Sequence, residues 1–245
     1  MKYSLASPPG ACFMRQSSWY NGAGSMTPLG VLWHDTAGGN KELRRYVQPD
    51  TTAPDRAFWL GKLGVNQYHN SWNERPLSKG VNAFIGAAAD GEVMAVQVGP
   101  WTKCPWGVGA KELGNATLNS THIQFEICDD YRNGPCKADY FEAVYREGVE
   151  LTAYLCKLYG FDPHGTLTIY GKQVPVITSH SEAGKLGVGS EHDDPLKWFA
   201  RFGRTMDDVR RDVAALLAEP PAAPMGLTDE ECAVIYQRGK AYFER

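Results

Sequence analysis

Short apolar runs alternate along this chain with longer stretches in which apolar residues recur at helical spacing. Residues 30–34, 81–87, 92–98, 121–128 and 174–178 form compact apolar or β-branched runs, which are typical of strands in a buried sheet. The second and third runs are joined by Ala-Ala-Asp-Gly, and Asp-Gly is a strong hairpin signal. These runs therefore predict a central sheet that contains a hairpin.

The longest helical pattern covers residues 138–159, where an apolar stripe follows the segment and Gly160 ends it. A second helix is predicted over 205–218, because Thr205 and Asp208 form a capping signature. Residues 40–47 and 54–62 predict shorter helices. Since strands and helices are intermixed, we expect an α/β fold with a central mixed β-sheet flanked by helices.

The composition shifts near residue 219. Residues 219–226 are rich in proline and predict a short stiff linker. Residues 227–245 carry an apolar helical face but are too few to form a core of their own. We therefore expect a main domain over 1–218 and a C-terminal helix that docks on it, pairs with a second copy in a homodimer, or begins an attachment module.

Composition and charge narrow the classes of partner. The 245 residues carry a formal net charge of −3 and are 43% hydrophobic, which indicates an ordinary globular protein and gives no sign of a nucleic-acid partner. No apolar run is long enough to span a bilayer. The N-terminal residues make a poor signal peptide, so we expect synthesis in the cytoplasm or export by another route.

The six cysteines are scattered along the sequence, and we expect them to be reduced thiols. Cys128 and Cys136 are the pair most worth testing for a disulfide.

Two histidines lie where predicted strands end. His34 follows the run 30–33 and precedes a glycine-rich loop, and His180 follows the run 174–178. Either histidine alone could simply cap its strand in polar contacts. Together with a nearby carboxylate, however, two imidazoles make the set of three protein ligands and one open position that catalytic zinc uses.

Several segments together give the chain a resemblance to a known family. They are residues 34–38 (His-Asp-Thr-Ala-Gly), 81–86, 90–91, 97–101, 119–128, 179–182 and 192–194. On these segments, in this order between residues 28 and 217, the chain resembles the zinc-dependent N-acetylmuramoyl-L-alanine amidases of the phage endolysin and peptidoglycan-recognition type. The resemblance implies a Zn²⁺ site formed by His34, His180 and Asp194.

The resemblance also implies two catalytic residues. Glu126 lies in the strand run, where alternation puts it on one face with Gln124 and Cys128. A carboxylate there can take a proton from the attacking water and pass it to the departing amine. His192 stands where relatives have a basic residue and would stabilise the oxyanion. The alternatives are a salt-bridged carboxylate and a solvent-facing histidine.

Substrate contacts are expected in the tryptophan- and glycine-rich loops, because aromatic rings pack on sugar faces. The candidates are Trp72, Asn82 and Trp106, with Trp33 and Asn73 as further members of the wall. Many relatives carry histidine in place of Asn82 and at Gly107, so the chain departs from the family pattern at these two positions. The expected function is hydrolysis of the muramoyl–L-alanine amide of peptidoglycan by an endolysin that reaches the wall after release. Two alternatives remain open, namely a cytoplasmic amidase of soluble muropeptides and a non-catalytic peptidoglycan-binding module.

Overall fold

A six-stranded mixed sheet forms the centre of the protein. The computed structural model describes residues 1–109, 117–131 and 136–219. The strands follow the order β1-β4-β3-β5-β2-β8; their bounds are β1 Gly10–Ala11, β4 Val93–Gln97, β3 Ala83–Ala87, β5 His122–Ile127, β2 Gly30–Asp35 and β8 Ile177–Ser179. The β3–β4 pair is antiparallel, and every other neighbouring pair is parallel. The α/β fold with a central mixed sheet is confirmed.

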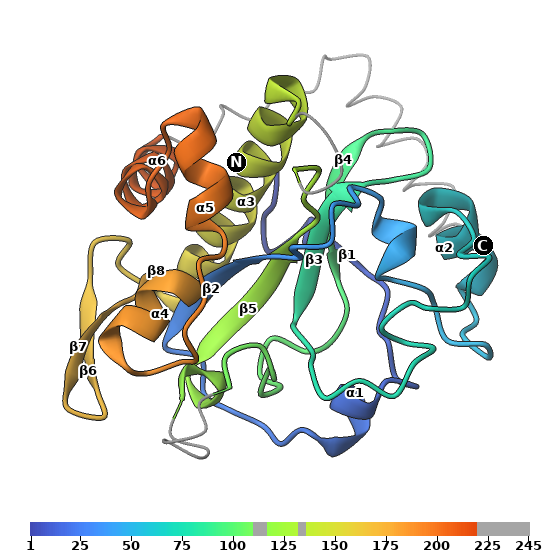
Figure 1. The fold of residues 1–245 in the computed structure, drawn as a ribbon, viewed down its shortest axis with the longest axis horizontal. Helices are drawn as coiled ribbons and strands as arrows, with labels where there is room; N and C mark the ends of the chain where they lie inside the picture. The colour runs from blue at the N-terminus through green and yellow to red at the C-terminus, as the bar shows by residue number, and fades with distance from the viewer. Residues whose placement is uncertain (110–116, 132–135, 220–245) are drawn as a thin grey trace, which may run out of the picture.

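Helix α3 (Ala138–Tyr159) covers one face of the sheet, and α6 (Met206–Ala218) packs beside it (Figure 1). The short α5 (Leu196–Phe199) and the 3₁₀ turn η3 (Ala200–Phe202) complete this layer. The apolar stripe of α3 meets alternate strand residues, which include Val31, Trp33, Ile123 and Phe125. This is the largest of the three hydrophobic clusters. Because side chains alternate along a strand, the residues between those that pack on α3 point to the other face of the sheet.

The opposite face carries smaller elements. Helices α1 (Ser18–Gly22) and α2 (Arg56–Leu63), with the 3₁₀ turn η1 (Leu43–Arg45), bury a second apolar cluster around Phe84 and Val96. Helix α4 (His180–Leu186), the 3₁₀ turn η2 (Leu118–Ser120) and the separate hairpin of β6 (Thr166–Ile169) and β7 (Lys172–Pro175) surround a third cluster that includes Leu32. The functional side chains lie on this side of the sheet.

Two helices were predicted closely. Helix α3 spans the expected residues and ends at Gly160, whose φ of 72° is left-handed. Helix α6 begins with the expected capping box, in which Thr205 accepts from the Asp208 amide and Asp208 accepts from the Thr205 amide.

Two local predictions were wrong. The segment 40–47 forms only the 3₁₀ turn Leu43–Arg45, and this single turn is enough to bury its apolar residues Leu43, Tyr46 and Val47. The run 174–178 is divided between two sheets, since Val174 pairs in the hairpin β6–β7 and Thr178 joins the central sheet through β8. Val176, between the two strands, bonds to Gly165 and Val31.

Some of the predictions concern residues that the structure does not describe. The predicted C-terminal helix, the homodimer contact through it and most of the linker lie outside the described residues. Within residues 1–109, 117–131 and 136–219, none of the helices has both the length and the apolar character needed to cross a bilayer. Cys12, Cys104, Cys128, Cys136 and Cys156 are free thiols, so Cys128 and Cys136 are not joined.

Candidate metal centre

Two neighbouring strands carry the first part of the site. The parallel strands β2 and β5 run in a register that pairs His34 with Glu126. Because side chains alternate along a strand, both residues point away from α3, whereas Trp33 and Phe125 belong to the core beneath that helix. The sheet thus holds an imidazole and a carboxylate side by side.

The junction between β8 and α4 supplies a second imidazole. The Ser179 hydroxyl accepts from the Glu182 amide and caps α4, so that His180 becomes the first residue of the helix. Since β8 pairs with β2, the rings of His34 and His180 meet with their centroids 4.8 Å apart. The predicted position of His180 at a strand exit is confirmed.

Asp194 lies between the two imidazoles. Its backbone carbonyl accepts from the Ser181 amide at 2.9 Å, which fixes the loop after α4 against the helix. Nδ1 of His34 lies 3.1 Å from one carboxylate oxygen of Asp194, and Nδ1 of His180 lies 3.1 Å from the other. The ligand atoms of the three buried residues lie within 4.8 Å of one another, close enough to share one ion.

The hydrogen bonds around the cluster favour a bound cation. Nε2 of His34 faces Gln124 Oε1 at 2.9 Å, and Nε2 of His180 faces Ser190 Oγ at 2.9 Å. If each Nε2 carries the proton, both Nδ1 atoms present lone pairs to the Asp194 carboxylate, which cannot donate. Among the described residues, the buried Oδ1 of Asp194 also receives no hydrogen bond of acceptable geometry, although Nδ1 of His180 is near. Three converging lone pairs fit a metal ion, and the two-nitrogen, one-oxygen set suits zinc.

Electrostatics within the cluster are strongly coupled. Burial would raise the pKa of Asp194, but the close imidazoles of His180 and His34 outweigh it and hold that pKa well below its usual range. Burial lowers the pKa of His180 to about 4 despite the attraction of Asp194. Burial also opposes charge on His34, yet Asp194 and Glu126 outweigh it and raise the pKa of this imidazole. The histidines differ because a proton on His34 repels a second proton on His180. The cluster therefore favours a positive charge beside Asp194.

Glu126 sits next to this cluster, and one oxygen of its carboxyl group is unpaired among the described residues. Its side chain is buried, with 8% of the residue exposed, and its Oε2 has no hydrogen bond from any described residue. Burial raises the pKa of Glu126 to about 8, although the attraction of His34 opposes this shift. Neighbouring positive charge favours the ionised form of a carboxyl group, so a cation held by the cluster would make Glu126 available as a base.

His192 lies at the outer side of the cluster. Its ring stacks on His180 with centroids 4.2 Å apart, and its Nδ1 is 3.0 Å from Asp194 Oδ1. Its side chain is 56% exposed. The structure therefore brings His192 to the same site while leaving part of its ring open to solvent.

Comparison with known proteins identifies the family. The profile of the N-acetylmuramoyl-L-alanine amidases matches residues 24–197, which include the whole cluster and Glu126. The chain belongs to this amidase family. It is accordingly an enzyme that hydrolyses the amide bond between N-acetylmuramic acid and L-alanine in peptidoglycan.

Several solved structures are similar to the amidase at low sequence identity. The hydrolase AmiA of Staphylococcus aureus, in complex with its ligand, is 19% identical over 88% of this chain and 80% of that chain, with a TM-score of 0.49. A mutant of PlyL is 17% identical over 84% of this chain and 98% of that chain, also with a TM-score of 0.49. The catalytic domain of XlyA is 15% identical over 83% of this chain and 97% of that chain, with a TM-score of 0.48. Comparison with curated proteins finds no match. The assignment of the amidase rests on the family profile.

Most of the expected substrate wall is internal in the amidase. Trp72 is buried, and its ring packs edge-on against Phe84 with centroids 4.9 Å apart. Asn82 is fully buried; its Nδ2 donates to the carbonyls of Pro100 and Lys103, and its Oδ1 accepts from the Gln124 amide. In this structure, Trp72 therefore packs in the core and Asn82 holds a loop against β5.

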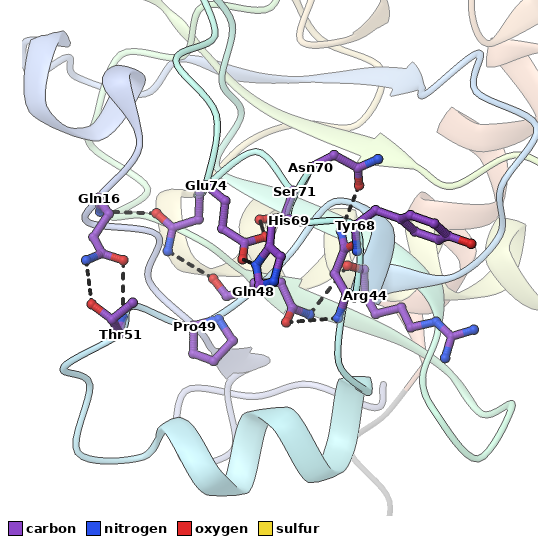
Figure 2. A network of polar contacts seen from close by, with 12 residues as sticks. Gln16, Arg44, Gln48, Pro49, Thr51, Tyr68, His69, Asn70, Ser71 and Glu74 are labelled. Atoms are coloured by element: carbon purple, nitrogen blue, oxygen red, sulfur yellow. Dashed lines mark hydrogen bonds and ion pairs between the residues drawn. The ribbon is translucent and has the colours of Figure 1, made fainter.

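Asn73 and Trp33 are also occupied within the amidase. The Asn73 side chain donates to the Gln48 carbonyl and the Asp50 carboxylate and accepts from the Gln16 amide. These bonds belong to a polar network that ties residues 66–74 to residues 44–51 (Figure 2). Trp33 is fully buried beneath α3. Neither residue lines an open surface.

Of the predicted substrate contacts, Trp106 is the residue that lines a cleft. It lines a cleft of about 480 Å³ together with Gly22, Gly24, Cys104, Pro105, Thr117, Asn119 and Ser120. Gly107, the next residue, approaches the cluster so closely that a Cβ there would lie 2.9 Å from His34 Nε2. The cleft residue Trp106 is therefore followed in the chain by a residue that packs against His34.

Sequence reasoning missed the residues that support the ligands. Gln124 and Ser190 bond to the Nε2 atoms of the two histidines, and Asn119 bonds to Gln124. The alternation of β5 placed Gln124 on the same face as Glu126, and this was the available signal. Ser190 lies in a loop without periodicity, so only the fold brings it to His180.

Proposed function

We propose that the amidase holds one zinc ion with His34, His180 and Asp194 and uses it to cleave the muramoyl–L-alanine bond of intact peptidoglycan. The observation that carries the proposal is the convergence of two imidazole nitrogens and one carboxylate on a shared point, beside Glu126, whose buried Oε2 accepts no hydrogen bond from the described residues. Zinc, when bound, would supply a Lewis acid that makes water a nucleophile near neutral pH.

In this proposal, protein side chains transfer the proton, stabilise the oxyanion and contact the substrate. Glu126 accepts the proton of the attacking water and returns it to the departing alanine nitrogen. His192, whose ring is partly open to solvent and stacked on His180, donates a hydrogen bond to the oxygen of the lactyl carbonyl as negative charge develops there. Trp106 packs against a sugar face at the edge of the cleft, and Asn82 acts indirectly by holding the loop at 100–103.

The proposed biological role is that of an endolysin. An open cleft beside the cluster suits a polymer better than a small molecule enclosed on all sides. In this proposal the catalytic domain covers residues 1–218, and the residues after the linker at 219–226 provide attachment to the wall or to a second copy. The enzyme would meet its substrate after release from the cell in which it is made.

Digestion of purified sacculi followed by mass spectrometry tests the reaction. We expect free stem peptides that begin with alanine. New reducing sugar ends, or cuts within the peptide cross-bridges, would contradict the proposed bond. Faster cleavage of soluble muropeptides than of sacculi would favour the recycling role instead. Binding to sacculi without any product, by protein shown to contain zinc, would favour a recognition module.

A further inference from the structure

A chain of polar contacts connects the main chain at Gly107 and Val108 to the ring of His34. Both backbone amides donate to Asn119 Oδ1, at 3.2 Å and 3.0 Å. The same oxygen accepts from Gln124 Nε2 at 3.0 Å, and Gln124 Oε1 lies 2.9 Å from His34 Nε2. The contacts therefore form one continuous path from the loop beside the cleft to a metal ligand.

The path has a fixed direction because it starts from backbone N–H groups, which can only donate. They require an oxygen at Asn119, and this oxygen requires the NH₂ group of Gln124 on its other side. The carbonyl end of Gln124 must then face His34, and a carbonyl can only accept. The proton of the neutral His34 imidazole consequently belongs on Nε2, and its lone pair belongs on Nδ1.

The opposite arrangement would break the pairing at Asn119. A flipped Gln124 would bring its oxygen against Asn119 Oδ1, and its NH₂ group would also face a second donor if His34 kept its proton on Nε2. Such buried mismatches remove hydrogen bonds and leave polar groups desolvated, which is unfavourable by about 1–3 kcal/mol for each group. His34 is almost fully buried and Gln124 completely so, so water has little access to repair the mismatch.

We propose that Gln124, held by Asn119, is a positioning residue that places the His34 proton on Nε2 and presents Nδ1 to the metal. Nδ1 is the nitrogen that faces Asp194 at 3.1 Å. This inference rests on the metal site of the proposed function but not on which bond is cleaved. A ligand that is already in the correct tautomer and ring orientation binds a metal more tightly, because binding then requires no proton shift or rotation.

Gly107 offers an independent way to disturb the same contact. A Cβ built at Gly107 would lie 2.1 Å from Gln124 Oε1, which is too close for any real contact. Gly107→Ala would push the flexible Gln124 amide away from His34, and its Cβ would also lie 2.9 Å from His34 Nε2. A loss of zinc affinity in this variant therefore supports the inference only together with a change in the His34 tautomer. This variant alters neither partner of the His34–Gln124 hydrogen bond.

Zinc affinity of the full chain, measured by competition with a chelating dye, is the first readout. We expect Gln124→Leu and Gly107→Ala to weaken zinc binding by about 10- to 100-fold, the range found for outer-shell partners of metal ligands. Gln124→Glu keeps an acceptor for His34 Nε2 but sets an oxygen against Asn119 Oδ1, so it should recover only part of the affinity. The matched control is Gln173→Leu, which removes a strand glutamine whose side-chain amide donates to Thr168 and should leave zinc binding unchanged.

The second readout is the tautomer of His34 in metal-free protein, observed by two-dimensional ¹H–¹⁵N NMR of the imidazoles at alkaline pH. The wild type should show the proton on Nε2, whereas Gln124→Leu and Gly107→Ala should show a mixture with Nδ1–H. A purely structural role would not change this tautomer.

The results that would refute the role of Gln124 differ from those that would refute the proposed reaction. If both variants keep the wild-type affinity, or lose affinity without any change of tautomer, the inference is wrong. Should Gln124→Leu fail to fold, Gly107→Ala alone decides. A wild type that binds zinc and shows the Nε2 proton but releases no stem peptides would refute the proposed reaction and leave this inference intact.

Discussion

Replacing Glu126 by glutamine should remove activity and stabilise the metal-free protein at the same time. Glutamine has nearly the same shape but cannot act as a base, and general-base catalysis contributes about 10²- to 10⁴-fold to rate. We therefore expect kcat for peptidoglycan cleavage to fall by about that factor. Zinc content should not change, because Glu126 is not one of the three proposed ligands.

The stability gain follows from the burial of this carboxyl group. In the unfolded chain it ionises with a pKa near 4.5, whereas burial in the fold raises the pKa to about 8. Between these values the unfolded chain loses a proton that the fold retains, so the stability of the metal-free wild type falls as pH rises. At pH 7 the loss amounts to about 3 kcal/mol, from 1.36 kcal/mol per pKa unit. Glu126→Gln has no such group, so it should exceed the wild type by up to that amount.

Urea denaturation of both proteins in the presence of a chelator measures the effect. The difference in unfolding free energy should be small at pH 4 and should grow steadily up to pH 7. A difference that does not vary with pH would refute the reasoning about burial. A variant that still cleaves sacculi at the wild-type rate would refute the assignment of Glu126 as the base.

Three further predictions concern other parts of the protein. Burial lowers the pKa of His122 to about 4, so the fold should lose about 3 kcal/mol as pH falls from 6.5 to 4, at 1.36 kcal/mol per unit; denaturation of His122→Gln should show a shallower pH slope, and an unchanged slope would contradict this. Zinc at a concentration 100 times its Kd should stabilise the wild type by about 2.7 kcal/mol, and thermal melts of His180→Ala should show no such gain; an equal gain would remove His180 from the ligand set. Trp106→Ala should raise KM for wall fragments by about 2- to 10-fold with kcat maintained, as expected for the loss of an aromatic contact worth 0.5–1.5 kcal/mol; steady-state kinetics with an unchanged KM would remove Trp106 from the cleft contacts.

The sequence predicted the sheet, the two long helices and the position of the two histidines at strand ends because each leaves a local pattern, whereas Asp194 was implied only by the family resemblance. The apolar stripe of α3 and the capping pair Thr205 and Asp208 act within a few residues of chain, so they can be read directly. The histidines follow apolar runs, and the structure indeed places both at strand ends close to Asp194.

The substrate wall was predicted less well because composition does not reveal which way a side chain points. Trp33 and Trp72 were candidates as aromatic residues near the motifs, but neighbouring helices and Phe84 cover them. Gln124 was passed over for a related reason. Its importance depends on Asn119 and Gly107, which reach it only through the fold.

The positions of the metal ligands in the sequence also affect the stability of the fold. His34 and Asp194 are 160 positions apart in sequence, and every cysteine in residues 1–109, 117–131 and 136–219 is unpaired. An ion bound by both would act as a reversible cross-link around one very long loop, the kind of tie for which the entropy of loop closure is greatest. Removal of the ion by a chelator should thus abolish activity and also make β8 and α4, at the edge of the sheet, susceptible to proteases before the rest of the sheet.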